Sequence, residues 1–120
     1  MLSRKLDNFI EKHYENNKSA LLLKGARQVG KTSAIRKYAR KQKMNLIEIN
    51  FYEDDSACGI FKGSQNAKDV LLRISALTKK KTSLPNTMIF FDEVQKCPEV
   101  ITWIKFLVDE GSCKYALSGS

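Results

Sequence analysis

The chain has 120 residues, of which 42% are hydrophobic, so it is long enough to bury the core of one domain spanning residues 1–120. No apolar run approaches the ~20 residues that cross a membrane, and the N-terminus lacks the uninterrupted apolar segment of a signal peptide. These features argue against a membrane or secreted protein and predict a cytoplasmic one. The net charge of +8 comes from residues 1–43, which hold 12 Lys and Arg against 3 Asp and Glu.

The first half of the chain alternates between helical and extended patterns. Apolar residues recur at helical spacing over residues 2–15, which predicts an amphipathic helix. The next apolar run predicts a strand over 20–24, and a helical pattern extends from Thr32 to Lys43. Residues 45–51 alternate enough to form a second strand, and residues 52–68 form a long polar connection that we expect to be functional or mobile.

The second half continues this alternation. Residues 69–78 are predicted to form a helix, and the apolar run over 87–92 a strand. Pro98 suits the first turn of a further helix that ends at Gly111, because proline fits helix starts and glycine fits helix ends. The last strand is expected over 113–118. Strands that alternate with helices predict an α/β fold with a mostly parallel sheet.

Residues 25–32 read Gly-Ala-Arg-Gln-Val-Gly-Lys-Thr and fit the pattern G-x-x-x-x-G-K-[ST] of a phosphate-binding loop. The octet follows a predicted strand and opens a predicted helix, which is the arrangement that the motif requires. In such a loop, backbone N–H groups bind phosphates, Lys31 reaches the β- and γ-phosphates, and the Thr32 hydroxyl is a natural Mg²⁺ ligand. Arg27 and Gln28 fit either a phosphate contact or a solvated loop face. The expected nucleotide-binding residues are Gly25, Ala26, Arg27, Gln28, Val29, Gly30, Lys31, Thr32 and Ser33.

Residues 88–95 read Met-Ile-Phe-Phe-Asp-Glu-Val-Gln and predict a buried strand that ends in two carboxylates. Ligands of parallel sheets bind beyond the C-terminal ends of the strands, so Asp92 is expected to hold Mg²⁺ through water. Glu93 is expected to polarise an attacking water as general base. A solvated acidic turn is the alternative, and the phosphate loop upstream weighs against it. A kinase acting on a small molecule needs no such glutamate, so the pair favours a hydrolase.

Two further groups allow more than one interpretation. After the last predicted strand, Ser118 or Ser120 can hydrogen-bond the γ-phosphate or the water, or the segment is simply a Ser-Gly-Ser loop. The expected catalytic residues are therefore Glu93, Lys31 and Ser118. A basic cluster after the phosphate loop fits either a nucleic-acid surface or a solvated helix face that also attracts a polyanionic nucleotide. Its members are Arg36, Lys37, Arg40, Lys41 and Lys43.

The three cysteines, Cys58, Cys97 and Cys113, are odd in number, widely spaced and without a C-x-x-C pair. We expect reduced cytosolic thiols rather than a metal site or a disulfide framework. His13, the single histidine, is expected to have a structural role on the apolar face of the first helix.

With these motifs in place, the chain resembles the AAA-like branch of P-loop ATPases, and in particular a bacterial and archaeal family. That family carries Gly-Ala-Arg-Gln-Val-Gly-Lys-Thr-like loops and Asp-Glu-Val-Gln-like catalytic strands, here residues 25–32 and 92–95, and residues 118–120 resemble the end of its sensor strand. The resemblance implies a three-layer P-loop NTPase sandwich with strand order 1-4-3-2. Family members continue with a fifth strand beside the first, a helical lid and a C-terminal domain of unknown function, so this chain resembles their N-terminal part only.

These features together predict Mg²⁺-dependent binding and hydrolysis of ATP. Two alternatives stay open: a nucleotide-binding switch module with little turnover, and a GTPase, against which the Asp92-Glu93 pair argues. ATP and ADP are the expected ligands, and Mg²⁺ is the expected metal, held by Thr32 and Asp92. With the fifth strand missing, the first strand is expected to be an unpaired edge that favours self-association. Nucleic-acid binding depends on the basic cluster alone.

Overall fold

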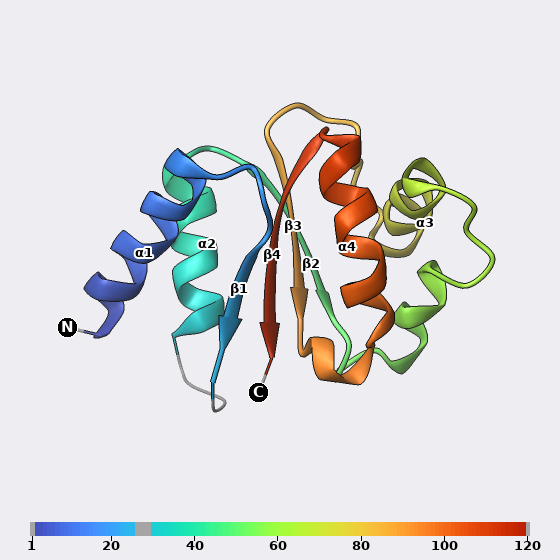
Figure 1. Ribbon diagram of the computed structural model, residues 1–120, viewed down its shortest axis with the longest axis horizontal. Helices are drawn as coiled ribbons and strands as arrows, with labels where there is room; N and C mark the ends of the chain where they lie inside the picture. Colours follow the sequence, from blue (N-terminus) through green and yellow to red (C-terminus); the bar gives the residue numbers. More distant parts are fainter. Residues whose placement is uncertain (1, 26–29, 120) are drawn as a thin grey trace.

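In the computed structural model, residues 2–25 and 30–119 are described, and they form a four-stranded parallel sheet covered on both faces by helices (Figure 1). Within these residues, no helix combines the length and the apolar character that are needed to cross a membrane. The elements in chain order are α1 (Leu2–Asn16), β1 (Leu21–Lys24), α2 (Lys31–Lys41), β2 (Asn45–Asn50), η1 (Asp55–Ile60), α3 (Ala67–Thr78), β3 (Thr87–Asp92), η2 (Val94–Lys96), α4 (Glu99–Glu110) and β4 (Cys113–Gly119), where η marks a 3₁₀ helix.

Helices α1 and α2 cover one face of the sheet, and α3 and α4 cover the other (Figure 1). Each face has its own apolar core. Ile35 of α2 packs with Phe90 of β3 on one side, whereas Ile74 of α3 and Leu107 of α4 share a cluster with Phe91 on the other. The side chains of β3 alternate between the two cores, which explains why this strand is apolar at successive positions. The predicted three-layer α/β architecture is confirmed.

The strands lie in the order β1-β4-β3-β2, and every neighbouring pair is parallel. This is the order that the family resemblance implied. In the register of the sheet, Asp92 of β3 lies beside Asn50 of β2 on one side and Ser118 of β4 on the other, and Ser118 in turn lies beside Leu23 of β1. The polar C-terminal ends of the strands therefore lie together at one end of the sheet, the end to which all four arrows point in Figure 1.

The connection after β2 differs most from its prediction. The strand ends at Asn50, and the next residue, Phe51, is buried in a turn. The supposed polar loop contains η1, whose Ala57 and Ile60 are buried in the same core cluster as Phe91, so part of this segment is packed structure. The following helix starts two residues earlier than predicted. The Asn66 side chain caps it by accepting a hydrogen bond from the Asp69 N–H at 2.9 Å.

The cysteine prediction is wrong for two of the three residues. Cys58 of η1 and Cys97, just after η2, form a disulfide, with their Cα atoms 5.7 Å apart, and Cys113 is the free, half-buried cysteine. The bond joins segments that are 39 residues apart. Spacing alone could not reveal this pair, because the fold of η1 onto the end of β3 brings the two residues together.

Candidate nucleotide-binding site

The two glycines of the phosphate-loop motif lie at the end of β1 and at the start of α2. Gly25 has a φ of 130° and Gly30 a φ of 148°, and among the described residues, the chain neighbours aside, no atom lies within 4 Å of where a Cβ would be placed on either. The backbone conformation therefore favours glycine at both positions. The other predicted loop residues, Ala26, Arg27, Gln28 and Val29, lie outside the described residues.

Lys31 is the first residue of α2 and the cation of the site. Its Nζ donates to the carbonyl oxygen of Gly25 at 3.2 Å and to that of Gly119 at 3.4 Å, so it lies between the end of β1 and the end of β4. Gly30 offers no side-chain cap to the helix, whose first-turn N–H groups can therefore point at a phosphate. Ser33 is exposed in the same turn. These groups form a positively charged helix start.

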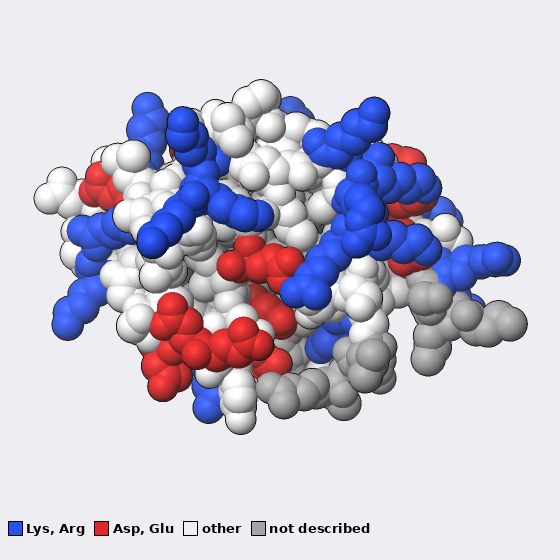
Figure 2. All heavy atoms as spheres, turned by 180° about the vertical axis from the view of Figure 1, so that it is seen from behind, with Lys and Arg blue, Asp and Glu red and all other residues white. Residues whose placement is uncertain are grey.

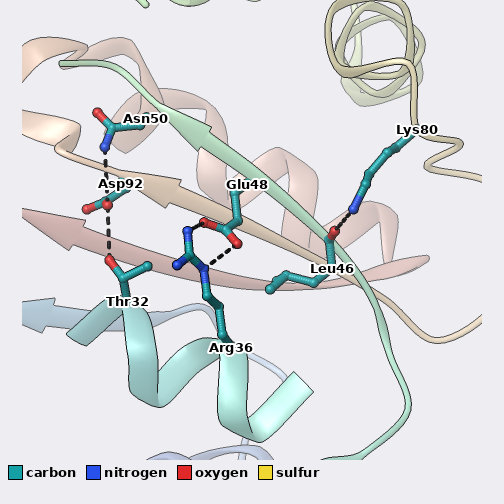
Figure 3. Close-up of polar contacts among 7 residues, drawn as sticks. All are labelled: Thr32, Arg36, Leu46, Glu48, Asn50, Lys80 and Asp92. Atoms are coloured by element: carbon teal, nitrogen blue, oxygen red, sulfur yellow. Dashed lines mark hydrogen bonds and ion pairs between the residues drawn. The ribbon is translucent and has the colours of Figure 1, made fainter. Parts of the chain in front are cut away.

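Thr32 and Asp92 come together from segments 60 residues apart (Figure 3). The Thr32 Oγ1 donates to Asp92 Oδ2 at 3.3 Å, and the Asp92 Oδ1 accepts the N–H of Glu93 at 2.9 Å. A hydroxyl and a carboxylate oxygen at this distance are the hard donors that Mg²⁺ prefers, and they leave room for the waters that Mg²⁺ usually keeps. The residues present therefore fit a Mg²⁺ site beside the phosphate loop.

Burial raises the pKa of the Asp92 carboxyl above its ordinary value of 3.8, and the neighbouring charge of Glu93 raises it further. The N–H of Glu93, the Thr32 hydroxyl and the charge of Lys31 lower this pKa and oppose the effect of burial. The ionised carboxylate is thus less stable here than in water. A bound divalent cation would stabilise it, which is a common property of metal-ligand carboxylates.

Asn50 is a site residue that the sequence analysis missed. Its Nδ2 donates to Asp92 Oδ2 at 3.5 Å (Figure 3). Its Oδ1 accepts the N–H groups of Tyr52 at 2.9 Å and Glu53 at 3.1 Å. Asn50 therefore connects the turn after β2 to the Asp92 carboxylate. The available signal was a polar residue at the end of a predicted parallel strand, in register with Asp92.

Glu93 has a left-handed backbone conformation, with φ 59° and ψ 49°, and a half-buried side chain. Such a conformation is uncommon for a residue with a Cβ and is found more often at functional sites. The Gln95 Nε2 donates to Glu93 Oε1 at 2.7 Å, a contact that the sequence analysis did not predict. Glu93 thus lies at the same C-terminal end of the sheet as Asp92, immediately beyond β3.

Ser118 is buried in β4 and lies directly beside Asp92 in the sheet register. Strand alternation places it on the same face as Ala116, which packs in the core beneath α1 and α2. It therefore shares a face with the start of α2. Its expected role toward the γ-phosphate stays a prediction.

A hollow of about 520 Å³ opens beside Asp92, between α2, the edge of β2 and the end of α3. Glu48, Glu53 and Asp54 line it together with Asp92. Figure 2 shows this group of acidic side chains between two groups of Lys and Arg. Arg36 spans the hollow and makes a paired contact with Glu48, at 2.8 and 2.9 Å (Figure 3).

The basic cluster on α2 is largely neutralised by neighbouring acids. Three of its five members form ion pairs, which leaves little unbalanced charge for a polyanion on this helix face. This arrangement favours the solvated helix face over a nucleic-acid surface. The pairs are Arg36–Glu48 at 2.8 Å, Lys37–Asp7 at 2.6 Å and Lys41–Glu11 at 2.7 Å.

A family model described as an AAA domain matches residues 17–120. The chain belongs to this AAA domain family. Membership indicates nucleotide binding and, in general, ATPase activity, and it agrees with the fold and with the groups gathered around Lys31 and Asp92. The comparison of this chain with curated proteins found no match.

Proposed function

We propose that this AAA domain binds ATP with Mg²⁺ and hydrolyses it. The observation that carries the proposal is the contact of Thr32 with Asp92 at 3.3 Å, next to a lysine that is held by Gly25 and Gly119. The sequence analysis assigned both residues to one Mg²⁺ site, and a turn that matched the loop pattern by chance would have no reason to bring them together.

In this proposal, the phosphates lie over the start of α2, where N–H groups and Lys31 face them. Thr32 and Asp92 hold Mg²⁺, which when bound neutralises phosphate charge. Glu93 accepts a proton from the attacking water, and Ser118 donates a hydrogen bond toward the γ-phosphate or the water. The phosphates would also contact residues 26–29 and Ser33.

The test is ATP binding by calorimetry, in Mg²⁺ and in EDTA, for the wild type, Lys31→Ala and the control Lys105→Ala. Lys105 is exposed on α4, so the control removes the same charge away from the site. We expect Lys31→Ala to lose ATP binding and Lys105→Ala to keep it, because an ammonium among phosphates forms charge-assisted hydrogen bonds. Equal ATP affinity for wild type and Lys31→Ala would refute the proposed binding site.

Hydrolysis is tested separately by steady-state turnover of the wild type and Glu93→Gln. Turnover in the wild type that is lost in Glu93→Gln supports the proposed base. Lys31-dependent ATP binding without turnover, together with tight retention of ADP, would replace hydrolysis by a nucleotide switch. Competition between ATP and GTP decides which nucleobase the site prefers, and tighter binding of GTP would favour a GTPase.

The cytoplasmic location stays a prediction. The Cys58–Cys97 disulfide weighs against it, because structural disulfides are rare in the reducing cytosol of most organisms.

A further inference from the structure

The chain turns back on itself directly after Glu93. The single 3₁₀ turn of η2 is closed by the Lys96 N–H, which donates to the Glu93 carbonyl oxygen at 3.0 Å. Together with the left-handed conformation of Glu93, this turn brings Gln95 back toward the carboxylate two residues earlier. The Gln95 Nε2 then donates to Glu93 Oε1 at 2.7 Å, which is short for a contact of an amide with a carboxylate.

The other end of the Gln95 amide packs against the end of β4. A Cβ added to Gly119 would lie 2.9 Å from Gln95 Oε1 and 3.1 Å from Val94 Cγ2, so only glycine leaves room for this arrangement. The backbone of Gly119, unlike that of Gly25, does not have the positive φ that favours glycine. The requirement at Gly119 is therefore one of space.

Gly119 also contacts the phosphate side of the site, because its carbonyl oxygen accepts from Lys31 Nζ at 3.4 Å. A continuous series of contacts thus runs from Lys31 through Gly119 and Gln95 to Glu93. It connects the lysine that faces the phosphates to the carboxylate proposed as base.

We propose that Gln95 is a positioning residue for hydrolysis, which holds the Glu93 carboxylate in one orientation. Gly119, which has no side chain, leaves room for the Gln95 amide. This inference rests on the proposed hydrolysis of ATP. A carboxylate on a flexible side chain samples several rotamers, and a donor fixed to one oxygen restricts it to the geometry that takes a proton from water. Gln95 is exposed, so its side chain adds little to the core.

The first experiment compares Gln95→Leu with Gln65→Leu, the same substitution at an exposed glutamine before α3. We expect Gln95→Leu to lower kcat about tenfold, part of the ~10²–10⁴ that general base catalysis typically contributes. The affinity for Mg-ATP should be unchanged, because the Gln95–Glu93 contact positions the proposed base rather than the phosphates. Gln65→Leu should match the wild type in both quantities.

The second experiment adds Gly119→Ala and the double variant Gln95→Ala/Gly119→Ala. The new methyl group of Gly119→Ala should displace the Gln95 side chain and reduce kcat. In the double variant the two losses in kcat should not add, because Gln95→Ala has already removed the side chain that the methyl group would displace. Additive losses would show that Gly119 acts independently of Gln95.

A binding-independent readout tests the contact itself. In a ¹⁵N NMR spectrum, Glu93→Ala should shift the side-chain amide resonances of Gln95, whereas Glu99→Ala, at an exposed position, should leave them unchanged. Unchanged Gln95 resonances in Glu93→Ala would overturn the proposal, and so would a Gln95→Leu variant with wild-type kcat or with equal losses in kcat and affinity. A wild type that binds ATP without turnover would overturn both hydrolysis and this positioning role, while leaving nucleotide binding intact.

Discussion

Asp92→Asn separates the function of the proposed metal site from the stability of the fold. The substitution keeps the size and shape of the side chain and removes its charge. We expect the Mg²⁺-dependent part of ATP affinity to fall about 10- to 100-fold, as is typical when a group that orients a metal site is replaced. The part of the affinity that persists in EDTA should change little.

The stability of the nucleotide-free protein should change by less than about 1 kcal/mol, because the hydrogen bonds of Asp92 are mostly replaceable. In the variant, the amide oxygen of the new side chain can still accept the Glu93 N–H, which lies 2.9 Å from the carboxylate in the wild type, and the amide nitrogen can donate to Thr32. Only the long contact from Asn50, at 3.5 Å, has no counterpart. Its loss is offset because the variant no longer buries a charge whose pKa is raised by burial.

The assay is a pair of ATP titrations, in Mg²⁺ and in EDTA, combined with urea unfolding of the same samples. Asp109→Asn is the matched control, since Asp109 is exposed near the end of α4 and the variant loses the same charge. If Asp92→Asn keeps the wild-type ratio of the two ATP affinities, Asp92 does not hold Mg²⁺. A large loss of stability in Asp92→Asn would show that the hydrogen bonds of Asp92 are not replaceable by those of an amide.

Three further predictions concern protonation, thiols and the sheet edge. As the pH falls through the raised pKa of Asp92, Mg²⁺-dependent ATP affinity should be lost at a higher pH than for an ordinary aspartate. The ionised carboxylate destabilises the fold at neutral pH, and this unfavourable contribution should disappear over the same pH range. An ATP affinity that stays constant down to pH 3.8, the ordinary pKa, would contradict the raised pKa on which both expectations depend. Denatured protein purified without reductant should show one titratable thiol, that of Cys113, and three thiols would exclude the Cys58–Cys97 bond. Self-association through β1 should appear in light scattering as a concentration-dependent rise in mass, because β1 pairs only with β4 among the described strands and exposes Leu22, and a monomer at all concentrations would refute it.

The sequence predicted the elements well because each carries a local signal, whereas the strand order followed from the family resemblance. The apolar run before Asp92 is typical of a strand buried on two faces, and Gly25, Lys31 and Thr32 occupy fixed positions of one motif. The meeting of Thr32 with Asp92 followed from the rule that parallel strands end at one edge.

The parts that could not be predicted depend on packing between distant segments. The fold of η1 onto the core comes from scattered apolar residues in a polar stretch, and the Cys58–Cys97 bond follows from that fold. The roles of Asn50 and Gln95 likewise depend on side-chain directions at the ends of β2 and η2, which have no periodic pattern in the sequence.

The two outer strands of the sheet, β1 and β2, also differ in how their free edges are covered, and no sequence pattern indicated this difference. Lys80 Nζ donates to the carbonyl oxygen of Leu46 at 2.8 Å and so occupies part of the free edge of β2 (Figure 3). A lysine at this position discourages another strand from pairing there. The β1 edge has exposed Leu22 instead, so we expect any further strand to add beside β1.

The insertion of β4 between β1 and β3 has a consequence for biosynthesis. N-terminal elements emerge from the ribosome first, yet β1 has no neighbour in the described sheet until residues 113–119 have been made. The carbonyl group of Gly119 that receives Lys31 is synthesised 88 residues after that lysine. The sheet that supports the nascent phosphate loop can therefore form only after nearly all of residues 30–119 have been synthesised. Parallel pairings over such separations close slowly, so this interval is when the apolar strands are most exposed to aggregation and to chaperones.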